Sequence, residues 1–368
     1  MKTLLADLVK IESYSGQEGT LASFVLNWAQ LHGLKAEKQD GNVVITFVAH
    51  SSQALIFNAH MDTVKPGNVD FWSFPPVGVH AGVVKKGKLY GLGASDDKAA
   101  IAAFLGLAVQ LKKTPPPLDV FIVFVISEET DGSGSQSFLH YFQKRHAANY
   151  QEVAVVIGEP TDLTSIEIGH RGNIFLKVTT SGDSGHGSQP ESIKTHAIYN
   201  QIKIIEEIKK IGKFVATKYK DPVLGLPTFC LTGLQSDSTS VNTVSSTCSS
   251  TWDIRTTPKL HDTLVHLVEE KLGNKGNIEC IGTPAPPGFT SPDSKIVKVL
   301  QNIVPGGKVT VSPGSNDICA FTAANVPAVA FGPGQKETIH KPNEYVQLQN
   351  ITNAVGLYKQ IIYSQYYV

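Results

Sequence analysis

Three things that the sequence lacks narrow the class of protein. The 368 residues carry 32 basic and 32 acidic side chains, so the formal net charge is zero. That balance argues against nucleic-acid binding through bulk charge and against a polybasic membrane anchor. No stretch approaches the roughly 18 apolar residues of a membrane-spanning helix. Asp7 and Lys10 interrupt the first apolar residues, so we expect no secretory signal in this sequence.

Cysteine is also scarce. The four cysteines are scattered and include no Cys-x-x-Cys pair. We therefore expect reduced structural thiols in a cytoplasmic protein.

Short apolar runs of strand length occur in the first 160 residues, at 43–48, 55–59, 120–126 and 153–157. The run 120–126 is apolar throughout, as a strand covered on both faces would be. An Ala-rich helical pattern over 98–112 separates two of the runs. These features predict an α/β fold with a mixed, mostly parallel sheet and helices on both faces.

The middle of the chain has a different pattern. Residues 174–180 alternate apolar and polar, and further predicted elements follow: helices at 193–211 and 260–272 and strands at 228–234, 247–254 and 277–281. We expect an α+β domain with an antiparallel sheet here. After the Pro/Gly-rich segment 282–292, the α/β pattern resumes with helices at 295–303 and 352–363 and strands at 308–311 and 328–331. The sequence thus predicts a domain of 172–283 inserted into a discontinuous catalytic domain of 1–171 and 284–368.

Imidazoles and carboxylates follow several predicted strands. His60, the adjacent pair Glu128 and Glu129, and Glu159 each come directly after an apolar run. In open α/β sheets, ligands bind at the carboxyl ends of the strands. Two adjacent carboxylates repel each other unless a cation or a shared proton is present.

Two more segments add candidates. The segment 91–98, Gly-Leu-Gly-Ala-Ser-Asp-Asp-Lys, superficially suggests a dinucleotide loop. Asp96 would repel a pyrophosphate, however, so we reject that interpretation; a helix cap is its structural alternative. His340 lies in the segment 337–344, after the Gly-Pro-Gly turn at 332–334.

The whole set consists of two imidazoles and four carboxylates, without a thiolate: His60, Asp96, Glu128, Glu129, Glu159 and His340. Two metal ions that share one carboxylate, each with one histidine and one further carboxylate, would use five of the six. Such ligands suit Zn²⁺, with Co²⁺ or Mn²⁺ possible. The sixth residue, a carboxylate, could accept a proton from water in a hydrolase.

Together these segments resemble the di-zinc aminoacylase/carboxypeptidase family of metallopeptidases, which includes acetylornithine deacetylase, succinyl-diaminopimelate desuccinylase, aminoacylase and glutamate carboxypeptidase. The resemblance covers nearly the whole chain. It implies two Zn²⁺ per subunit, with Asp96 bridging them and a cis peptide bond after it. It further implies His60 and Glu159 on one metal, Glu129 and His340 on the other, Glu128 as the general base, and Asp62 orienting His60.

The predicted insert carries part of the same resemblance. The segment 184–190, Ser-Gly-His-Gly-Ser-Gln-Pro, is similar to the family's lid motif. The similarity implies that His186 stabilises the oxyanion, generally in the other subunit, and hence a homodimer formed through the insert. Asn242 and Arg255 match lid positions that contact a substrate carboxylate or carbonyl; the alternative for Arg255 is a strand-end salt bridge. Gly314 and Ser315 match the family's substrate loop, from which Pro313 and Asn316 depart.

The favoured function is the release of an acyl group from an N-acyl amino acid, as in acetylornithine deacetylase, with a role in amino-acid biosynthesis. A succinyl-diaminopimelate desuccinylase-like enzyme and a dipeptidase or carboxypeptidase of the same family are the alternatives. A non-catalytic binding protein on this fold is a more remote one. We expect a small N-acyl amino acid or short peptide as ligand, and neither nucleic acid nor membrane as partner.

Overall fold

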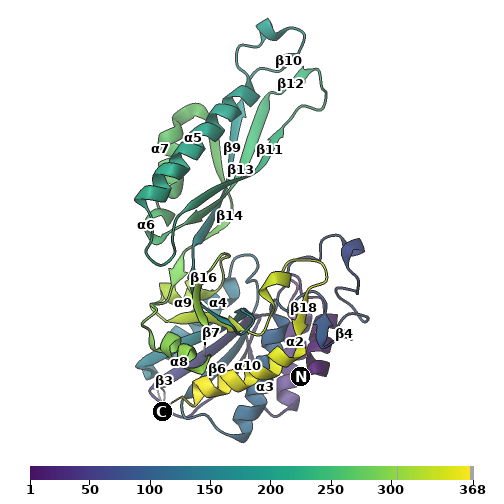
Figure 1. Ribbon diagram of the computed structural model, residues 1–368, viewed down its shortest axis with the longest axis vertical. Helices are drawn as coiled ribbons and strands as arrows, with labels where there is room; N and C mark the ends of the chain where they lie inside the picture. The colour runs from purple at the N-terminus through teal and green to yellow at the C-terminus, as the bar shows by residue number, and fades with distance from the viewer. Residues whose placement is uncertain (305, 365–368) are drawn as a thin grey trace. The chain divides into compact units, whose positions relative to one another are not determined.

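The computed structural model describes residues 1–304 and 306–364 (Figure 1). The chain divides into two compact units. The first comprises Met1–Gly169, Phe289–Ser312 and the residues from Asn316 onward, and the second comprises His170–Gly288 with Pro313–Ser315. The described residues include no helix that is both long and apolar enough to cross a membrane.

A nine-stranded sheet forms the centre of the first unit. Its order is β1 (Ala36–Gln39), β2 (Asn42–Phe47), β6 (Asp119–Val125), β3 (Gln53–His60), β7 (Glu152–Pro160), β17 (Ala328–Gly332), β8 (Ser165–His170) and β15 (Gly288–Phe289), with β16 (Lys308–Ser312) beside β8. The four neighbours β6, β3, β7 and β17 run parallel, whereas β1, β2 and β8 are antiparallel to their partners. The predicted mixed, mostly parallel sheet is confirmed.

Helices cover both faces of this sheet. On one face, α3 (Lys98–Lys113) packs against β3, β6 and β7 and against α1 (Lys2–Lys10) and α10 (Leu348–Ile362), while α8 (Lys295–Ile303) lies beside α10 and β17. On the other face, α4 (Ser133–Arg145) and α9 (Ile318–Ala323) enclose a second core cluster. The remaining helix of this unit, α2 (Gly19–Leu31), packs against β1 and β2.

Burial on both faces explains the uniformly apolar strands. In β3, Ile56 belongs to the cluster beneath α4 and α9. The next residue, Phe57, contacts the rings of Phe104 and Tyr358 from α3 and α10, with centroids 5.4 and 5.5 Å apart. No polar face remains, so the usual alternation disappears.

A small three-stranded sheet joins distant segments of the first unit. Its order is β18 (Tyr345–Gln347), β5 (Lys88–Tyr90) and β4 (Val83–Lys85). The chain after His340 is thereby paired with the chain before Asp96. These three strands were not predicted from the sequence.

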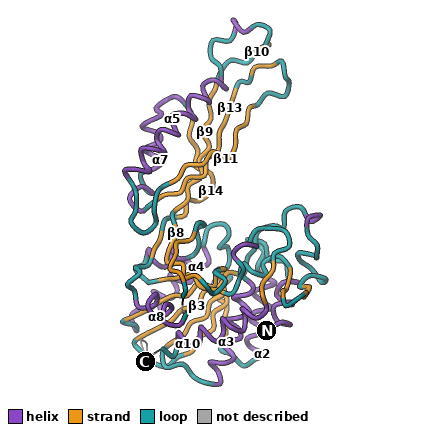
Figure 2. Tube along the Cα trace, viewed as in Figure 1, coloured by secondary structure: helices purple, strands orange, loops and turns teal. Residues whose placement is uncertain are grey.

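The second unit has its own antiparallel sheet, in the order β11 (Thr228–Ser236), β13 (Thr247–Thr256), β9 (Gly172–Ser181) and β14 (Asn277–Ala285). Figure 2 shows α5 (Ala197–Lys218) and α7 (Leu264–Leu272) side by side along these strands. Alternate side chains of β9 and β13 are buried, and they form one core with both helices. The predicted antiparallel sheet is confirmed.

Two predicted helices of this unit differ in detail. The helix expected from residue 193 begins at Ala197, because a short 3₁₀ turn (Pro190–Ser192) and four further residues precede it. The helix expected over 260–272 is split into α6 (Pro258–His261) and α7. A separate two-stranded ribbon pairs β10 (Gly185–His186) with β12 (Thr243–Val244).

Candidate metal centre

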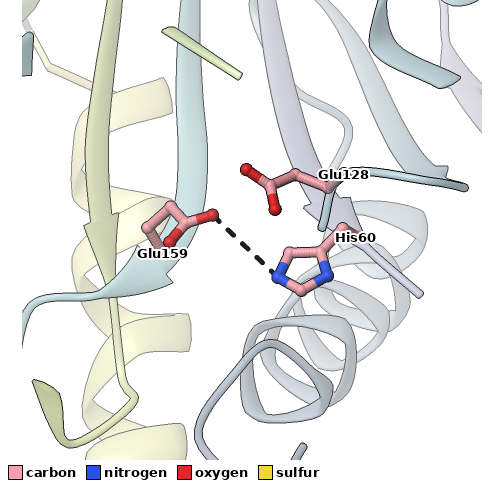
Figure 3. Close-up of side chains that lie close together, drawn as sticks. All are labelled: His60, Glu128 and Glu159. Atoms are coloured by element: carbon pink, nitrogen blue, oxygen red, sulfur yellow. Dashed lines mark ion pairs between the residues drawn. The ribbon is translucent and has the colours of Figure 1, made fainter. Parts of the chain in front are cut away.

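The parallel strands bring His60, Glu128 and Glu159 together. β3 ends at His60, Glu128 follows the end of β6, and Glu159 is the penultimate residue of β7. Because β6, β3 and β7 are parallel neighbours, these positions meet at one edge of the sheet. Figure 3 shows the three side chains converging, with His60 Nε2 3.9 Å from Glu159 Oε1. One ligand atom from each lies within 4.8 Å of the others, close enough to hold a metal ion.

Asp96 lies between the two histidines. Its Oδ1 is 2.9 Å from His60 Nε2, and its Oδ2 is 3.5 Å from His340 Nε2. His340 Nε2 is also 2.9 Å from Glu129 Oε1, and His60, Asp96 and Glu129 form a second group that could hold a metal ion. The Asp96–Asp97 peptide bond is cis, as the resemblance implied.

The electrostatics of this cluster fit a bound cation. Burial raises the pKa of Glu128 and of Glu159 well above its usual value, and neighbouring carboxylates raise both further. Burial alone would lower the pKa of His60, but hydrogen bonds to Asp62 and Asp96 raise it well above normal. The hydrogen bond that His340 donates to Glu129 raises the pKa of His340 to about 9. Carboxylates packed this closely repel one another unless positive charge lies among them. Divalent cations supply that charge.

Asp97 is a further buried acid whose surroundings fit a bound cation. Its side chain is buried, and neither carboxylate oxygen has a hydrogen-bond partner among the described residues. Burial raises its pKa well above normal. The chemistry of the donors around it, imidazole nitrogens and carboxylate oxygens, matches the ligands that zinc takes in catalytic sites.

Asp62 organises the segment that carries the two glutamates. It is fully buried; its Oδ1 accepts the main-chain N–H of Glu128 at 3.0 Å, and its Oδ2 accepts that of Glu129 at 3.0 Å. The Ser15 hydroxyl also donates to Oδ2, at 2.7 Å. The closest Asp62 atom to His60 Nδ1 is the main-chain oxygen, at 2.9 Å, whereas Oδ1 lies 3.4 Å away.

The other predicted site residues belong to the second unit. His186 and Asn242 lie together at the two-stranded ribbon, with His186 Nε2 3.2 Å from Asn242 Nδ2. Arg255 pairs with Asp253, with Nε 2.8 Å from Oδ1 and Nη2 2.9 Å from Oδ2. This is the strand-end salt bridge considered above. Gly314 and Ser315 also belong to this unit, and the Ser315 hydroxyl donates to the Arg171 main-chain oxygen at 3.3 Å.

Two buried acids of the first unit, Asp317 and Glu344, were not predicted as site residues from the sequence. Asp317 Oδ2 accepts the Ser135 hydroxyl and the Asn58 amide at 2.5 and 3.0 Å, and burial raises its pKa to about 6. Glu344 is 1% exposed and accepts main-chain N–H groups of the loop before Asp96. Both lie within segments that carry predicted site residues, and that proximity was the available signal.

Comparison with known proteins identifies the family. The model of peptidase family M20/M25/M40 matches residues 56–364. The chain belongs to this family. The chain is 26% identical over 386 residues to succinyl-diaminopimelate desuccinylase 2 of Ruegeria sp. (strain TM1040), covering 98% of this chain and 93% of the relative. It is also 26% identical over 362 residues to the acetylornithine deacetylase of Proteus mirabilis (strain HI4320), covering 93% and 89%.

The fold of this M20 chain also resembles solved structures. A tripeptidase from Staphylococcus aureus superposes with a TM-score of 0.77 at 20% identity, covering 98% of this chain and 96% of that one. The predicted family is therefore confirmed, and with it a hydrolase that acts on amide bonds. The family is metal-dependent, and this chain has the groups that could bind a metal.

Proposed function

We propose that this M20 hydrolase is a di-zinc enzyme that releases the acyl group from an N-acyl amino acid, like acetylornithine deacetylase. The observation that carries the proposal is the placement of Asp96, whose two oxygens face His60 and His340 separately. That arrangement is what a carboxylate shared by two ions requires. Co²⁺ and Mn²⁺ are compatible with the same donors.

Five side chains would hold the metals. His60 and Glu159 would bind one ion, His340 and Glu129 the other, and Asp96 both. Bound there, the ions would act as Lewis acids that polarise the amide carbonyl and acidify a water molecule.

Glu128 would move the proton. It lies beside His60 and Glu159 but is not one of the five proposed ligands, and burial raises its pKa, which makes it a better proton acceptor. Its carboxylate would take a proton from the attacking water, whose oxygen bonds to the acyl carbon. When the carbon–nitrogen bond breaks, Glu128 would return that proton to the leaving amine. The products are a carboxylic acid and a free amine.

The second unit would contribute to substrate binding. His186 would donate to the oxyanion, and Asn242, Arg255, Gly314 and Ser315 would hold the substrate's carboxylate or carbonyl groups. A guanidinium binds a carboxylate through two parallel hydrogen bonds, so Arg255 would exchange Asp253 for the substrate or share its donors between them. We also propose a homodimer through this unit, with His186 acting on the partner's substrate.

A hydrolysis screen tests the reaction and the substrate together. The Zn²⁺-loaded protein would be given N-acetylornithine, N-succinyl-diaminopimelate, other N-acetyl amino acids and dipeptides, with and without chelator, and free amine would be measured. We expect chelator-sensitive release from N-acetylornithine. Preference for the succinyl substrate would support the desuccinylase alternative, which the Ruegeria relative favours, and preference for dipeptides would support a peptidase. A protein that binds no metal and cleaves no substrate would contradict the proposal.

Subunit complementation tests the role of His186. Glu128→Gln and His186→Ala variants, each impaired alone, would be mixed under conditions that allow subunit exchange. If His186 acts across subunits, mixed dimers contain one site with both native residues, and activity returns. No recovery in a mixture that sedimentation shows to be dimeric would place His186 in its own subunit's site, and a monomer would contradict the dimer.

A further inference from the structure

Glu344 is a buried carboxylate without an ion pair. Glu344 is 1% exposed, and none of the salt bridges found among residues 1–304 and 306–364 includes it. Burying a carboxylate is unfavourable unless hydrogen bonds replace the lost water. The structure shows where those bonds come from.

Three main-chain N–H groups of one loop donate to this carboxylate. Oε1 accepts the N–H of Ser95 at 2.8 Å and that of Asp96 at 3.0 Å, and Oε2 accepts the N–H of Gly93 at 3.0 Å. Main-chain N–H groups of one loop that converge in this way form a concave site for an anion. Burial beside Asp96 raises the pKa of Glu344 to about 8, and the three N–H donors act in the opposite direction.

Glycine makes this loop geometry possible. Gly93 has φ +73°, a conformation that side chains disfavour. A Cβ there would also approach the Thr63 Cγ2 atom to 2.7 Å. The loop is therefore shaped so that its N–H groups face inward, toward Glu344.

Main-chain contacts also join the segment around Glu344 to the Asp96 loop. The Gly91 N–H donates to the Glu344 main-chain oxygen at 3.0 Å, and the Ser95 hydroxyl donates to the Tyr345 oxygen at 2.8 Å. Tyr345 is also paired with Tyr90 in the small sheet. The segment that begins at His340 thus binds the Asp96 loop through the Glu344 side chain and through main-chain contacts.

We infer that Glu344 is a positioning residue that shapes the Asp96 loop before metal binds and fixes it to the segment carrying His340. The inference rests on the proposed function, because it takes Asp96 and His340 as metal ligands. Without the carboxylate, three inward-facing N–H groups lose their acceptor, and the loop must change shape to pair them. Asp96 would then no longer be held between His60 and His340.

Hydrogen exchange on the wild-type protein tests the first part. In metal-free protein, we expect the amides of the peptide spanning residues 91–97 to exchange slowly, with little further protection when Zn²⁺ is added. Fast exchange without metal, followed by protection on metal addition, would overturn the inference, because metal rather than Glu344 would then shape the loop. This measurement needs no variant to fold.

Variants test the second part through metal affinity. Glu344→Gln places an amide donor against at least one loop N–H, so we expect it to bind Co²⁺ about 10- to 100-fold more weakly, as is typical when a partner of a metal ligand is lost. Its visible cobalt spectrum should also change. Glu344→Asp, which keeps the carboxyl group but shortens the reach, should fall between Gln and wild type. The matched control is Glu337→Gln, an exposed carboxylate three residues before His340 that accepts the Tyr345 hydroxyl at 3.1 Å.

The outcomes separate this inference from the proposed function. If wild type binds two ions and is active, but Glu344→Gln keeps wild-type affinity and spectrum, the positioning role is wrong. A lower melting temperature with unchanged affinity would likewise leave Glu344 with a role in folding alone. If wild type itself binds no metal, the proposed function fails, and the exchange experiment still decides whether the loop is preformed.

Discussion

Asp62 and Glu128 are joined by a hydrogen bond of 3.0 Å from the main-chain N–H of Glu128 to Oδ1 of Asp62. The same carboxylate accepts the N–H of Glu129, and the Asp62 main chain contacts His60. One buried residue, through its side chain and its main-chain oxygen, therefore fixes the proposed base and the proposed ligand Glu129 relative to the proposed ligand His60.

We expect Asp62→Asn to impair catalysis. The amide can offer only one oxygen, so in either orientation its NH₂ group faces the N–H of Glu128 or Glu129. The displaced segment should lower kcat about 10- to 100-fold, as for other partners of metal ligands, with a smaller effect on KM. Steady-state kinetics would measure this, with the exposed Asp70→Asn as control. A wild-type kcat in Asp62→Asn would contradict the role given to Asp62.

Glu128→Gln should remove turnover without removing metal. General-base catalysis contributes about 10²- to 10⁴-fold, and we expect kcat to fall by at least that range. Metal content, measured by mass spectrometry after dialysis, should stay at the wild-type value because Glu128 is not among the five proposed ligands. An active Glu128→Gln enzyme, or one that has lost its metal, would show that the assignment is wrong.

The two histidines should control different ions. His60→Ala and His340→Ala should each retain a single tightly bound ion, whereas Asp96→Ala should lose both, because Asp96 is the proposed shared ligand, with one oxygen toward each imidazole. Isothermal titration with Zn²⁺ would count the sites. Equal loss in all three variants would argue for one metal site rather than two.

The second unit should lose stability in mild acid through His261. Its Nδ1 lies 2.7 Å from the Thr256 hydroxyl oxygen, and burial lowers its pKa below the usual 6.5. The unfolded chain then binds a proton at a higher pH than the folded chain does. Stability is therefore complete above pH 6.5 and falls as the pH decreases from there toward the folded pKa.

Denaturant unfolding at several pH values would measure this effect. His261→Gln should flatten the pH dependence of the free energy of unfolding, while His266→Gln, at an exposed position of α7, should leave it unchanged. An identical pH dependence in wild type and His261→Gln would exclude His261 as the cause.

The sequence was most informative where burial and chemistry coincide. The run before Glu128 is apolar because β6 is covered on both faces, so strand and site could be predicted together. By contrast, α4 begins with Ser-Gly-Ser, residues of low helix propensity, and it owes its place to Phe138 and Phe142 packing into the core. No local pattern revealed that helix.

Glu344 is a clearer example of a role that could not be predicted from the sequence. The N–H groups that donate to its carboxylate lie almost 250 positions earlier in the chain. Main-chain donors leave no mark on residue identity, apart from the glycine that lets the loop turn. Only the folded chain shows what this carboxylate does.

The way the chain leaves the first unit at His170 and returns to it at Phe289 makes the continuous part of the second unit, His170–Gly288, a replaceable segment. β8 ends at His170, and Thr290, just beyond β15, donates its main-chain N–H to the Ile168 oxygen at 2.7 Å. The exit and return points of the polypeptide are thus hydrogen-bonded neighbours. A short turn could bridge them, or an unrelated domain could be grafted between them, while the strands that carry the metal ligands keep their own connections.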